Sequence, residues 1–324
     1  MRPILLLAGL LTVAAPAGAQ APSALLVLLR NDKAMAIVDP GKGTILARVP
    51  AGEDPRGVAV SADGALAFVA DMNGGAILVI DVAARKQIRR VDLGAGSSPQ
   101  DIHVAGGHVY FTAEGFKAIG RYDPAADKID WWIGTGQNST HTMTLSKDAD
   151  VIVAGNRASN SVSVVEKVSA GPPDWIVTLI PTGKSAQGIG MSPDGREVWT
   201  ANWEIERDGV SIIDVASKQV THLPVRTQHA NRVVFTPDGR RVLLADESGG
   251  ELWVFDAASR KDIQRIKVAP GALLLTADGS RAYAAVSRER HIAVIDLNTL
   301  SVTGRIDTGS SPGAMAWGGP GGSR

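Results

Sequence analysis

The chain has 324 residues, of which 44% are hydrophobic, a composition that can form a large buried core and excludes a mainly disordered protein. Lysine plus arginine and aspartate plus glutamate number 33 each, so no global charge favours nucleic acid, anionic membranes or acidic substrates. The sequence has no cysteine, which excludes disulfides, thiolate nucleophiles, cysteine-ligated metal centres and covalent haem attachment.

Residues 1–19 have the pattern of a signal peptide. Met1-Arg2 supplies a positive start, residues 4–15 are rich in Leu and Ala, and Ala17-Gly18-Ala19 is typical of a cleavage site. The apolar run is shorter than the roughly 20 residues needed to cross a bilayer. We therefore expect cleavage before Gln20, no membrane span in the mature chain, and a location in a bacterial periplasm or outside the cell.

The mature chain is built from one repeat. Short runs of Val, Ile, Leu and Ala lie between Gly, Pro and Asp clusters, which indicates an all-β protein. A strand of the type Val-x-Val-Ile-Asp recurs and ends at an acidic residue, with spacings of 42, 42, 43, 48, 42 and 40. These acidic residues are Asp39, Asp81, Asp123, Glu166, Asp214, Asp256 and Asp296. Because such spacings suit four strands and their turns, residues 20–324 predict a single seven-bladed β-propeller with four antiparallel strands per blade.

One repeat divides into four strands, which we name A to D from the centre outward. We expect A over 57–61, B over 66–70, C over 76–81 and D over 87–93, with Asp-Gly turns such as Asp63-Gly64 joining A to B. The first repeat offers only B, C and D (24–29, 35–39 and 44–49), whereas residues 313–317 offer a lone strand A. Joining the two ends completes a blade and closes the ring, which removes exposed sheet edges.

These repeats resemble the YVTN-repeat family. The resemblance rests on Pro55-Arg-Gly-Val-Ala-Val-Ser-Ala-Asp-Gly64, on Phe68-Val-Ala-Asp71 with Ile77-Leu-Val-Ile-Asp81, and on Glu197-Val-Trp-Thr-Ala-Asn202. It covers nearly the whole mature chain and implies the propeller fold. It implies no single function, because similar propellers include lactonase-type enzymes, subunits of periplasmic quinoprotein and amine dehydrogenases, and scaffold proteins.

The first candidate site is the mouth of the central channel. Antiparallel order puts the D–A and B–C connections on one face, and these longer segments favour that face for binding. One position per blade then lies at the mouth, in five blades five residues before the Ser or Thr of the A–B turn. Gln100 assumes a turn that is shorter by one residue, and Gly313 is placed by analogy with Arg56. These positions are Arg56, Gln100, His141, Gln187, Asn231, Gly271 and Gly313, and we add the neighbouring His229 and Arg232. They either bind a polar ligand or only hydrate the channel and satisfy backbone groups.

A second ring follows from the last residue of each strand B. It comprises Arg30, Asp71, Glu114, Asn156, Asn202, Asp246 and Ser287, and Trp203 lies beside it on the same loop face. Asp and Asn at strand ends typically cap turns by bonding to the nearby backbone. If Asp71, Glu114 and Asp246 point inward instead, they offer oxygen ligands for a hard cation, although the sequence has no contiguous calcium loop.

Metal, cofactor and catalytic motifs are missing from the sequence. The six histidines form no His-x-His or His-Glu-x-x-His pattern, and we predict neither a metal site nor a cofactor. The sequence contains no Gly-x-Ser-x-Gly elbow and no phosphate-binding loop. A hydrolase would have to combine His141 or His229 as a base with Arg56 or Arg232 as a carbonyl-polarising cation. Zero net charge and scattered Arg and Lys residues argue against nucleic-acid binding.

The leading hypothesis is therefore a non-enzymatic, monomeric binding or scaffold propeller, exported from the cytoplasm. It would recognise a small polar ligand or a periplasmic protein partner through its loop face and channel mouth. The alternatives are a lactonase-type hydrolase and an accessory subunit of a periplasmic quinoprotein dehydrogenase.

Overall fold

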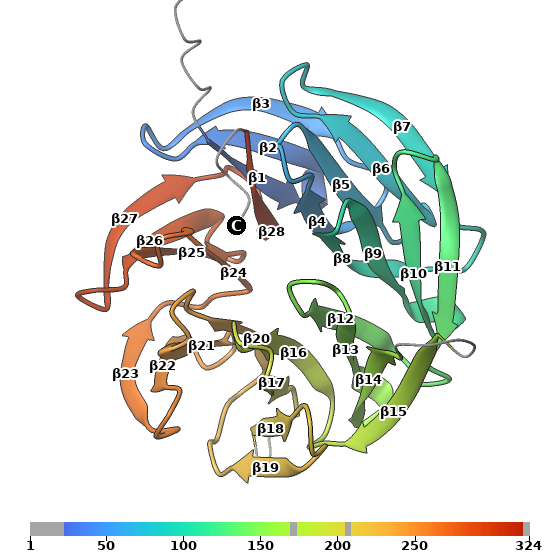
Figure 1. The fold of residues 1–324 in the computed structure, drawn as a ribbon. Helices are drawn as coiled ribbons and strands as arrows, with labels where there is room; N and C mark the ends of the chain where they lie inside the picture. The colour runs from blue at the N-terminus through green and yellow to red at the C-terminus, as the bar shows by residue number, and fades with distance from the viewer. Residues whose placement is uncertain (1–22, 169–173, 205–208, 320–324) are drawn as a thin grey trace, which may run out of the picture.

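Seven four-stranded antiparallel sheets surround a central channel (Figure 1). The structure is a computed structural model that describes residues 23–168, 174–204 and 209–319. The sequence prediction of a seven-bladed β-propeller is confirmed. The predicted signal peptide, residues 1–19, lies outside the described residues.

The first four blades follow the chain from its beginning. Blade 1 contains β28 (Pro312–Gly318), β1 (Ala24–Leu29), β2 (Ala34–Asp39) and β3 (Thr44–Pro50). Blade 2 contains β4 (Pro55–Val60), β5 (Leu66–Asp71), β6 (Ala76–Asp81) and β7 (Lys86–Asp92). Blade 3 contains β8 (Pro99–Ala105), β9 (His108–Ala113), β10 (Ala118–Asp123) and β11 (Lys128–Gly134). Blade 4 contains β12 (Thr140–Leu145), β13 (Val151–Asn156), β14 (Ser161–Lys167) and β15 (Trp175–Pro181).

The remaining three blades continue in the same order. Blade 5 contains β16 (Ala186–Met191), β17 (Glu197–Asn202), β18 (Val210–Asp214) and β19 (Val220–Leu223). Blade 6 contains β20 (Ala230–Phe235), β21 (Arg241–Asp246), β22 (Glu251–Asp256) and β23 (Asp262–Lys267). Blade 7 contains β24 (Ala272–Leu275), β25 (Arg281–Val286), β26 (His291–Asp296) and β27 (Ser301–Asp307). Helix within the described ranges is confined to the 3-10 turns η1 (Arg30–Asp32), η2 (Glu114–Phe116) and η3 (Arg157–Ser159).

The two ends of the chain close the ring, as the sequence predicted. Strand β28 pairs antiparallel with β1, so that Leu25 lies opposite Trp317 and Leu26 opposite Ala316. Figure 1 shows the last strand beside the first. The inner edge of β1 is therefore paired, because the C-terminal strand supplies strand A of blade 1.

The predicted Asp-Gly turns fix the A–B hairpins. In blade 2 the Ser61 hydroxyl donates a hydrogen bond to Asp63 Oδ1 at 2.6 Å, and the same oxygen accepts from the Ala65 backbone N–H at 3.0 Å. Gly64 follows with φ +74°, a conformation that glycine adopts without a Cβ penalty. These hairpins define the turn face of the molecule, opposite the loop face formed by the D–A and B–C connections.

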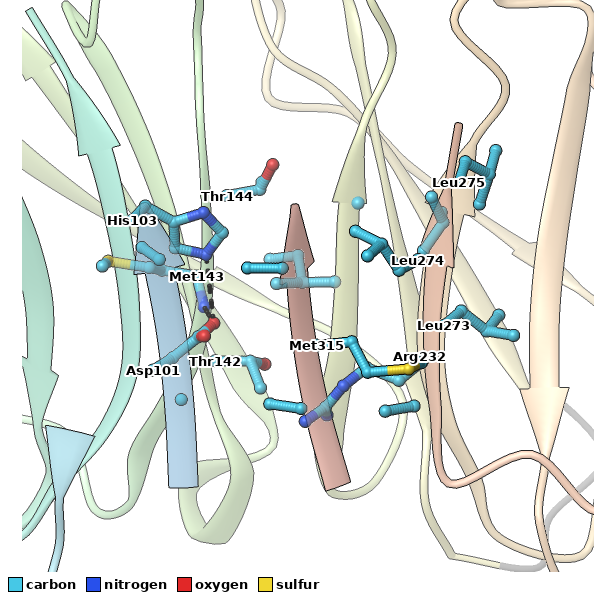
Figure 2. A pocket seen from close by; sticks show the side chains of 18 of the residues that line it. Asp101, His103, Thr142, Met143, Thr144, Arg232, Leu273, Leu274, Leu275 and Met315 are labelled. Atoms are coloured by element: carbon cyan, nitrogen blue, oxygen red, sulfur yellow. Dashed lines mark hydrogen bonds and ion pairs between the residues drawn. The ribbon is translucent and has the colours of Figure 1, made fainter. Parts of the chain in front are cut away.

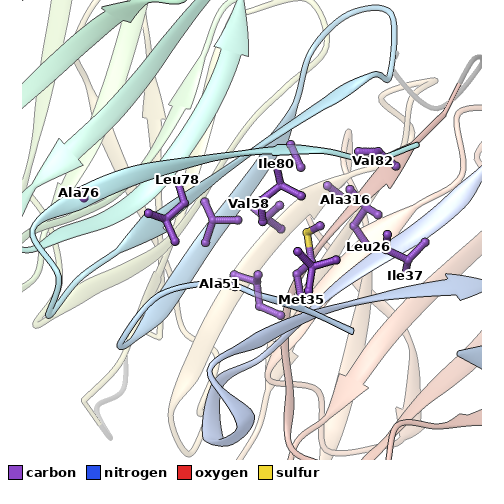
Figure 3. Packing of buried hydrophobic residues seen from close by; sticks show 14 residues of the cluster. Leu26, Met35, Ile37, Ala51, Val58, Ala76, Leu78, Ile80, Val82 and Ala316 are labelled. Carbon is purple, nitrogen blue, oxygen red and sulfur yellow. The ribbon is translucent and has the colours of Figure 1, made fainter. Parts of the chain in front are cut away.

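Each boundary between neighbouring blades holds one apolar cluster. Figure 3 shows the cluster between blades 1 and 2, where Met35 and Leu26 pack near Val58 and Leu78. Six further clusters occupy the other six boundaries. Because both faces of every sheet are covered by a neighbour, strands B and C read as nearly continuous apolar runs. The core is thus a ring of seven clusters around a channel whose wall is formed by the seven strands A.

Candidate functional site

A cavity of about 350 Å³ opens at the loop-face end of the channel. Its wall includes all seven predicted mouth positions: Arg56, Gln100, His141, Gln187, Asn231, Gly271 and Gly313. It also includes Arg232, Arg30, Asp101 and Glu247 from the strands and loops beside them. The repeat-based reasoning therefore identified positions that do meet at one place, although it could not show what they bind.

A β-bulge positions the mouth residue in six of the blades. In blade 5, for example, Ala186 pairs with Asn202 and Gly188 with Ala201, so Gln187 is the extra residue. Asn231 occupies the same position in blade 6, between the paired residues Ala230 and Arg232. Comparable shifts occur at the start of strand A in blades 1, 2, 3 and 4. Because a bulged residue is left out of the ladder, its side chain can be directed into the channel.

Two arginines at the mouth share one buried carboxylate. Arg56 Nε donates to Asp54 Oδ2 at 3.1 Å, and Arg30 Nη2 donates to the same oxygen at 3.1 Å. Asp54 is only 6% exposed. Burial lowers the pKa of Arg56, and the opposing effect of the Asp54 charge, which raises that pKa, does not cancel it. The guanidinium nevertheless stays protonated, since an arginine pKa lies far above neutrality.

Glu114 contacts the side chains of two mouth residues, Gln100 and His141. Its Oε2 accepts a hydrogen bond from Gln100 Nε2 at 3.2 Å, and its Oε1 lies 3.4 Å from His141 Nδ1. Burial would raise the pKa of Glu114, but the His141 imidazole and the Ser139 and Gln100 side chains lower it to about 2. The carboxylate is therefore ionised at neutral pH and fixes the side chains of Gln100 and His141.

Two buried oxygen atoms at the mouth have no hydrogen-bond partner within the described residues: Gln187 Oε1 and Asn231 Oδ1. The orientation of the Asn231 amide is fixed, because Nδ2 donates to Glu247 Oε2 at 3.0 Å and a carboxylate only accepts. Asn231 is 5% exposed, so its Oδ1 is a buried acceptor directed away from Glu247. Buried acceptors in native proteins are normally satisfied, so these atoms favour a ligand with hydrogen-bond donors.

Arg232 contributes a positive charge next to these acceptors. Its Nη1 donates to the Asn231 carbonyl oxygen at 2.9 Å. Within the described ranges no carboxylate oxygen lies within the 4.0 Å ion-pair distance of this guanidinium. Arg232 lines both the mouth cavity and a deeper cavity, so it lies where the two meet. An anionic group would therefore find a charge here that is not already paired with a carboxylate.

The channel continues toward the turn face as a second cavity of about 540 Å³, which we call the chamber (Figure 2). Its lining extends to Pro193 and Pro237 in the A–B turns, so the chamber reaches the turn face. Asp101 and His103, two residues apart on β8, form a pair in its wall, with His103 Nε2 3.3 Å from Asp101 Oδ2. The same oxygen accepts from the Met143 backbone N–H at 2.9 Å. Burial would raise the pKa of Asp101, but His103, Arg232 and the Met143 N–H lower it to about 2. Burial lowers the pKa of His103, but the Asp101 carboxylate outweighs it and raises that pKa.

Sequence reasoning missed Asp101, and a signal for it existed. Strands A of the seven blades contain only five ionisable residues: Arg56, Asp101, His103, His141 and Arg232. All five line one of the two cavities. An ionisable residue in an innermost strand of a propeller therefore indicates a channel-lining group.

His229 and Trp203 lie outside both cavities and form a separate surface cluster. Their rings stack with centroids 4.7 Å apart, and the Arg157 guanidinium carbon lies 5.7 Å from the Trp203 ring centroid. His229 Nδ1 is 2.9 Å from the Ser248 hydroxyl. Of the four residues considered for a hydrolase, Arg56, His141 and Arg232 thus line the mouth, and His229 lies apart on the loop face.

The other predicted loop-face residues mainly bind their own backbone and neighbouring hydroxyls. Asp71 Oδ1 accepts from the Glu53 and Asp54 N–H groups, both at 2.9 Å, and Asp246 accepts from the Gln228 N–H at 2.8 Å. Asn156 donates to Ser163 Oγ at 2.9 Å, and Asn202 donates to Ser211 Oγ at 3.1 Å. None of these four side chains lines either cavity.

One histidine–carboxylate group escaped the sequence analysis. His108, Asp123 and Asp130 on blade 3 bring their possible ligand atoms within 4.8 Å of one another. However, Arg121 binds both oxygens of Asp130 at 2.9 Å, so a cation would have to displace an existing bidentate pair. The group lies outside both cavities and adds nothing to the channel site.

The fold and the site define a seven-bladed β-propeller with a polar cavity at one end of its channel. No protein-family model matches the sequence, and no curated protein matches it. Solved structures match through the fold. A functionally unknown protein from Desulfotomaculum acetoxidans has a TM-score of 0.74 at 15% identity, over 92% of this chain and 99% of that one.

Two enzymes also appear among the similar structures. Hydrazine synthase from Kuenenia stuttgartiensis gives a TM-score of 0.72 at 18% identity, over 84% of this chain and 92% of that one. Virginiamycin B lyase from Staphylococcus aureus gives a TM-score of 0.67 at 14% identity, over 82% of this chain and 91% of that one. At these identities the likeness shows the fold alone. Within the described ranges, no helix combines the length and apolarity that crossing a membrane requires.

Proposed function

We propose that this chain is an exported, monomeric binding protein of the YVTN-repeat type, whose channel mouth binds a small anionic ligand that also carries O–H or N–H donors. The supporting observation is the combination, around one cavity, of the unpaired Arg232 charge with the buried acceptors Asn231 Oδ1 and Gln187 Oε1. An unsatisfied buried acceptor costs about 1–3 kcal/mol, and a ligand donor would remove that cost. The cavity volume lies at the lower end of small-molecule pockets, which range over roughly 300–1,000 Å³.

Two probes match this chemistry, gluconate and N-acetyl-L-serine, because each has a carboxylate and donor groups. Titration calorimetry with the purified mature chain should detect binding of at least one of them. Arg232→Gln should weaken that binding by about 30-fold or more, since it removes one partner of a desolvated charge pair. Asn231→Ala should weaken it by about two- to tenfold through the lost hydrogen bond.

His229→Ala serves as the matched control, because His229 lies on the same face but outside both cavities. Its affinity should equal that of the wild type. Absence of binding by both probes, or equal affinities for wild type and Arg232→Gln, would contradict the proposed function. In that case a protein partner on the loop face, or the accessory-subunit hypothesis, becomes the better reading.

A second candidate function is hydrolysis of a lactone, favoured by the Asp101–His103 pair and by Arg232 in the same chamber. His103 would take a proton from water, whose oxygen attacks the carbonyl carbon while Arg232 stabilises the developing oxyanion. The ring C–O bond then breaks, and the proton returns to the leaving alkoxide. Turnover of δ-gluconolactone above the buffer rate, abolished by His103→Gln and kept by His229→Ala, would establish this function. Turnover unaffected by His103→Gln would exclude the proposed base.

Export is a separate part of the proposal. We expect cleavage after Ala19, which would leave a mature chain that begins at Gln20. Intact-mass measurement on protein from a periplasmic fraction tests it. A cytoplasmic product that retains residues 1–19 would contradict it.

A further inference from the structure

The mouth and the chamber are parts of one continuous channel. Six residues line both cavities: Arg56, Asp101, Thr142, Arg232, Ala272 and Ala314. A ligand held at the mouth therefore has the chamber directly beneath it. The chamber is also the larger of the two, at about 540 Å³ against about 350 Å³.

The wall of the chamber has a polar side and an apolar side (Figure 2). Strands β8 and β12 present polar groups, including His103 and Thr144. Strand β24 presents three consecutive leucines, Leu273, Leu274 and Leu275, each half-buried. Strand β28 adds Met315 and Trp317, and the Trp317 Nε1–H is already bonded to the Leu275 carbonyl oxygen at 2.8 Å.

The mouth has a recess above this apolar side. The two mouth positions without a side chain, Gly271 and Gly313, precede or begin the strands that carry the leucines and Met315. At Gly313 an added Cβ would meet nothing closer than the Leu28 carbonyl oxygen at 3.5 Å, whereas at Gly271 it would meet Ser287 Oγ at 3.0 Å. The recess therefore lies at Gly313, and a chain attached to a ligand at the mouth can pass down blade 1 into the chamber.

The Arg232 charge and the buried acceptors of Asn231 and Gln187 lie next to this passage. Arg232 and Asn231 belong to blade 6, the ring neighbour of blade 7, and Gln187 belongs to blade 5. The head-binding groups and the apolar wall thus occupy adjoining sectors of the channel. Apolar surface that faces a narrow channel gains free energy when a hydrocarbon chain displaces its water.

We infer that the ligand of this site is amphipathic, with an anionic head at Arg232 and an unbranched apolar chain that lies along β24 and β28. The inference rests on the proposed function, because it extends the ligand bound at the mouth. It assigns to Leu273, Leu274, Leu275 and Met315 the role of selecting ligands by the length of their apolar chain.

A series of N-acyl-L-serines with acetyl, butanoyl, hexanoyl and octanoyl chains tests it by calorimetry. The head stays constant, so only the chain changes. Affinity should rise by about two- to fourfold for each CH₂ added until the chamber is filled, since a fully buried CH₂ corresponds to about fourfold. N-octanoyl ethanolamine, which lacks the carboxylate, should bind about 30-fold more weakly than N-octanoyl-L-serine, because Arg232 loses its partner.

Leu274→Gln tests the wall directly, with Val302→Gln as the matched control. Val302 lies on the outer strand of the same blade and is 47% exposed, away from the channel. Leu274→Gln should reduce the affinity for N-octanoyl-L-serine at least about fivefold and leave N-acetyl-L-serine within about twofold. Val302→Gln should change neither affinity.

The outcomes separate the two proposals. Binding of N-acetyl-L-serine with no gain along the wild-type series overturns the amphipathic ligand and leaves the mouth site standing, whatever the fate of Leu274→Gln. Equal binding of N-octanoyl ethanolamine and N-octanoyl-L-serine overturns the placement of the head at Arg232. If neither gluconate nor N-acetyl-L-serine binds, the proposed function itself has failed, even if longer members of the series bind.

Discussion

At the scale of single residues, the channel is lined by ionisable groups that the β-propeller fold does not require. Five ionisable residues occur in the seven innermost strands, and all five line the channel. Placing charge in a confined channel costs desolvation energy unless a partner compensates it. Asp101 and His103 compensate each other, whereas Arg232 is near enough to lower the pKa of Asp101 but forms no ion pair with it and donates to a carbonyl oxygen. Such perturbed groups in a cleft are candidates for function on physical grounds.

The Asp101–His103 pair predicts a specific titration. His103 should titrate above its ordinary value of 6.5, because the Asp101 charge outweighs the opposing effect of burial. The pair should therefore stabilise the fold fully below pH 6.5 and lose this contribution as pH rises through the raised pKa. In Asp101→Asn the pKa should fall below 6.5, because burial and the Arg232 charge remain. Chemical shifts of the His103 ring against pH measure both values.

His222, on the outer strand β19, provides the internal control for this titration, and its signals should be identical in both proteins. A His103 pKa that is unchanged by Asp101→Asn would contradict the pairing.

Asp71 shows the structural role of an acidic residue at a strand end. One of its oxygens, Oδ1, accepts from the N–H groups of Glu53, Asp54 and Gly74 at 2.9, 2.9 and 3.2 Å, and the residue is 1% exposed. Asp71→Ala should lower the free energy of unfolding by about 2–4 kcal/mol, because it leaves the buried Asp54 N–H and two partly buried N–H groups without an acceptor. Asp71→Asn should cost less, since it keeps Oδ1. Urea unfolding measures both.

The control for Asp71 is Asp81→Ala, at the half-buried last residue of β6, whose Oδ1 accepts from the Ala84 N–H in the exposed C–D turn. It should cost less than about 1 kcal/mol. Equal losses for Asp71→Ala and Asp81→Ala would contradict the structural role that we assign to the three hydrogen bonds of Asp71.

At the scale of elements, the repeat predicted the positions of the strands better than it predicted where their side chains lie. Strand C of blade 2 was expected over 76–81 and is β6 (Ala76–Asp81), whereas strand A was expected from residue 57 and β4 begins at Pro55. The difference arises from the bulge between Pro55 and Val58, which keeps the strand paired beyond its regular part. Spacing in sequence identifies strands and turns, but a bulge depends on three-dimensional strain and leaves no spacing signal.

Closure of the ring by β28 gives a prediction about one element. A chain that ends at Gly309 lacks the strand that pairs with β1 and leaves Leu25 and Leu26, both 0% exposed in the full chain, beside an open edge. We expect this truncated chain to lose its cooperative thermal transition and to aggregate, because one sheet edge and two clusters are uncovered. Circular dichroism and size-exclusion chromatography measure both effects.

A circular permutant controls for the shorter length of the truncated chain. It joins residues 319 and 23 through a flexible linker and starts in the exposed turn at 83–84, so every strand pairing is kept. It should melt close to the wild type. A truncated chain that melts at the wild-type temperature would contradict the structural role of β28.

At the scale of the whole molecule, seven blades share seven clusters, so each blade is held from both sides. An open repeat array is stabilised by nearest neighbours and can fray from its ends, whereas a closed ring has no end. The sequence could predict this ring because the repeat and its split blade are encoded locally. It could not predict the ligand, because the chamber is formed by side chains from strands far apart in the sequence, such as those of His103 and Leu274.

Closure predicts that damage to one boundary spreads around the ring. Trp199, 1% exposed, packs between blades 5 and 6 with ring centroids 6.0 Å from Phe235 and 5.9 Å from Phe255. Trp199→Ala should lower stability by about 3–5 kcal/mol. Hydrogen exchange should show the same loss of protection in β2 and β10, in blades 1 and 3, as in blade 6, because opening any boundary opens the ring. Trp132→Ala, at a position 41% exposed, should cost only about 1 kcal/mol. Loss of protection confined to blades 5 and 6 would show instead that the blades unfold independently and that closure does not couple them.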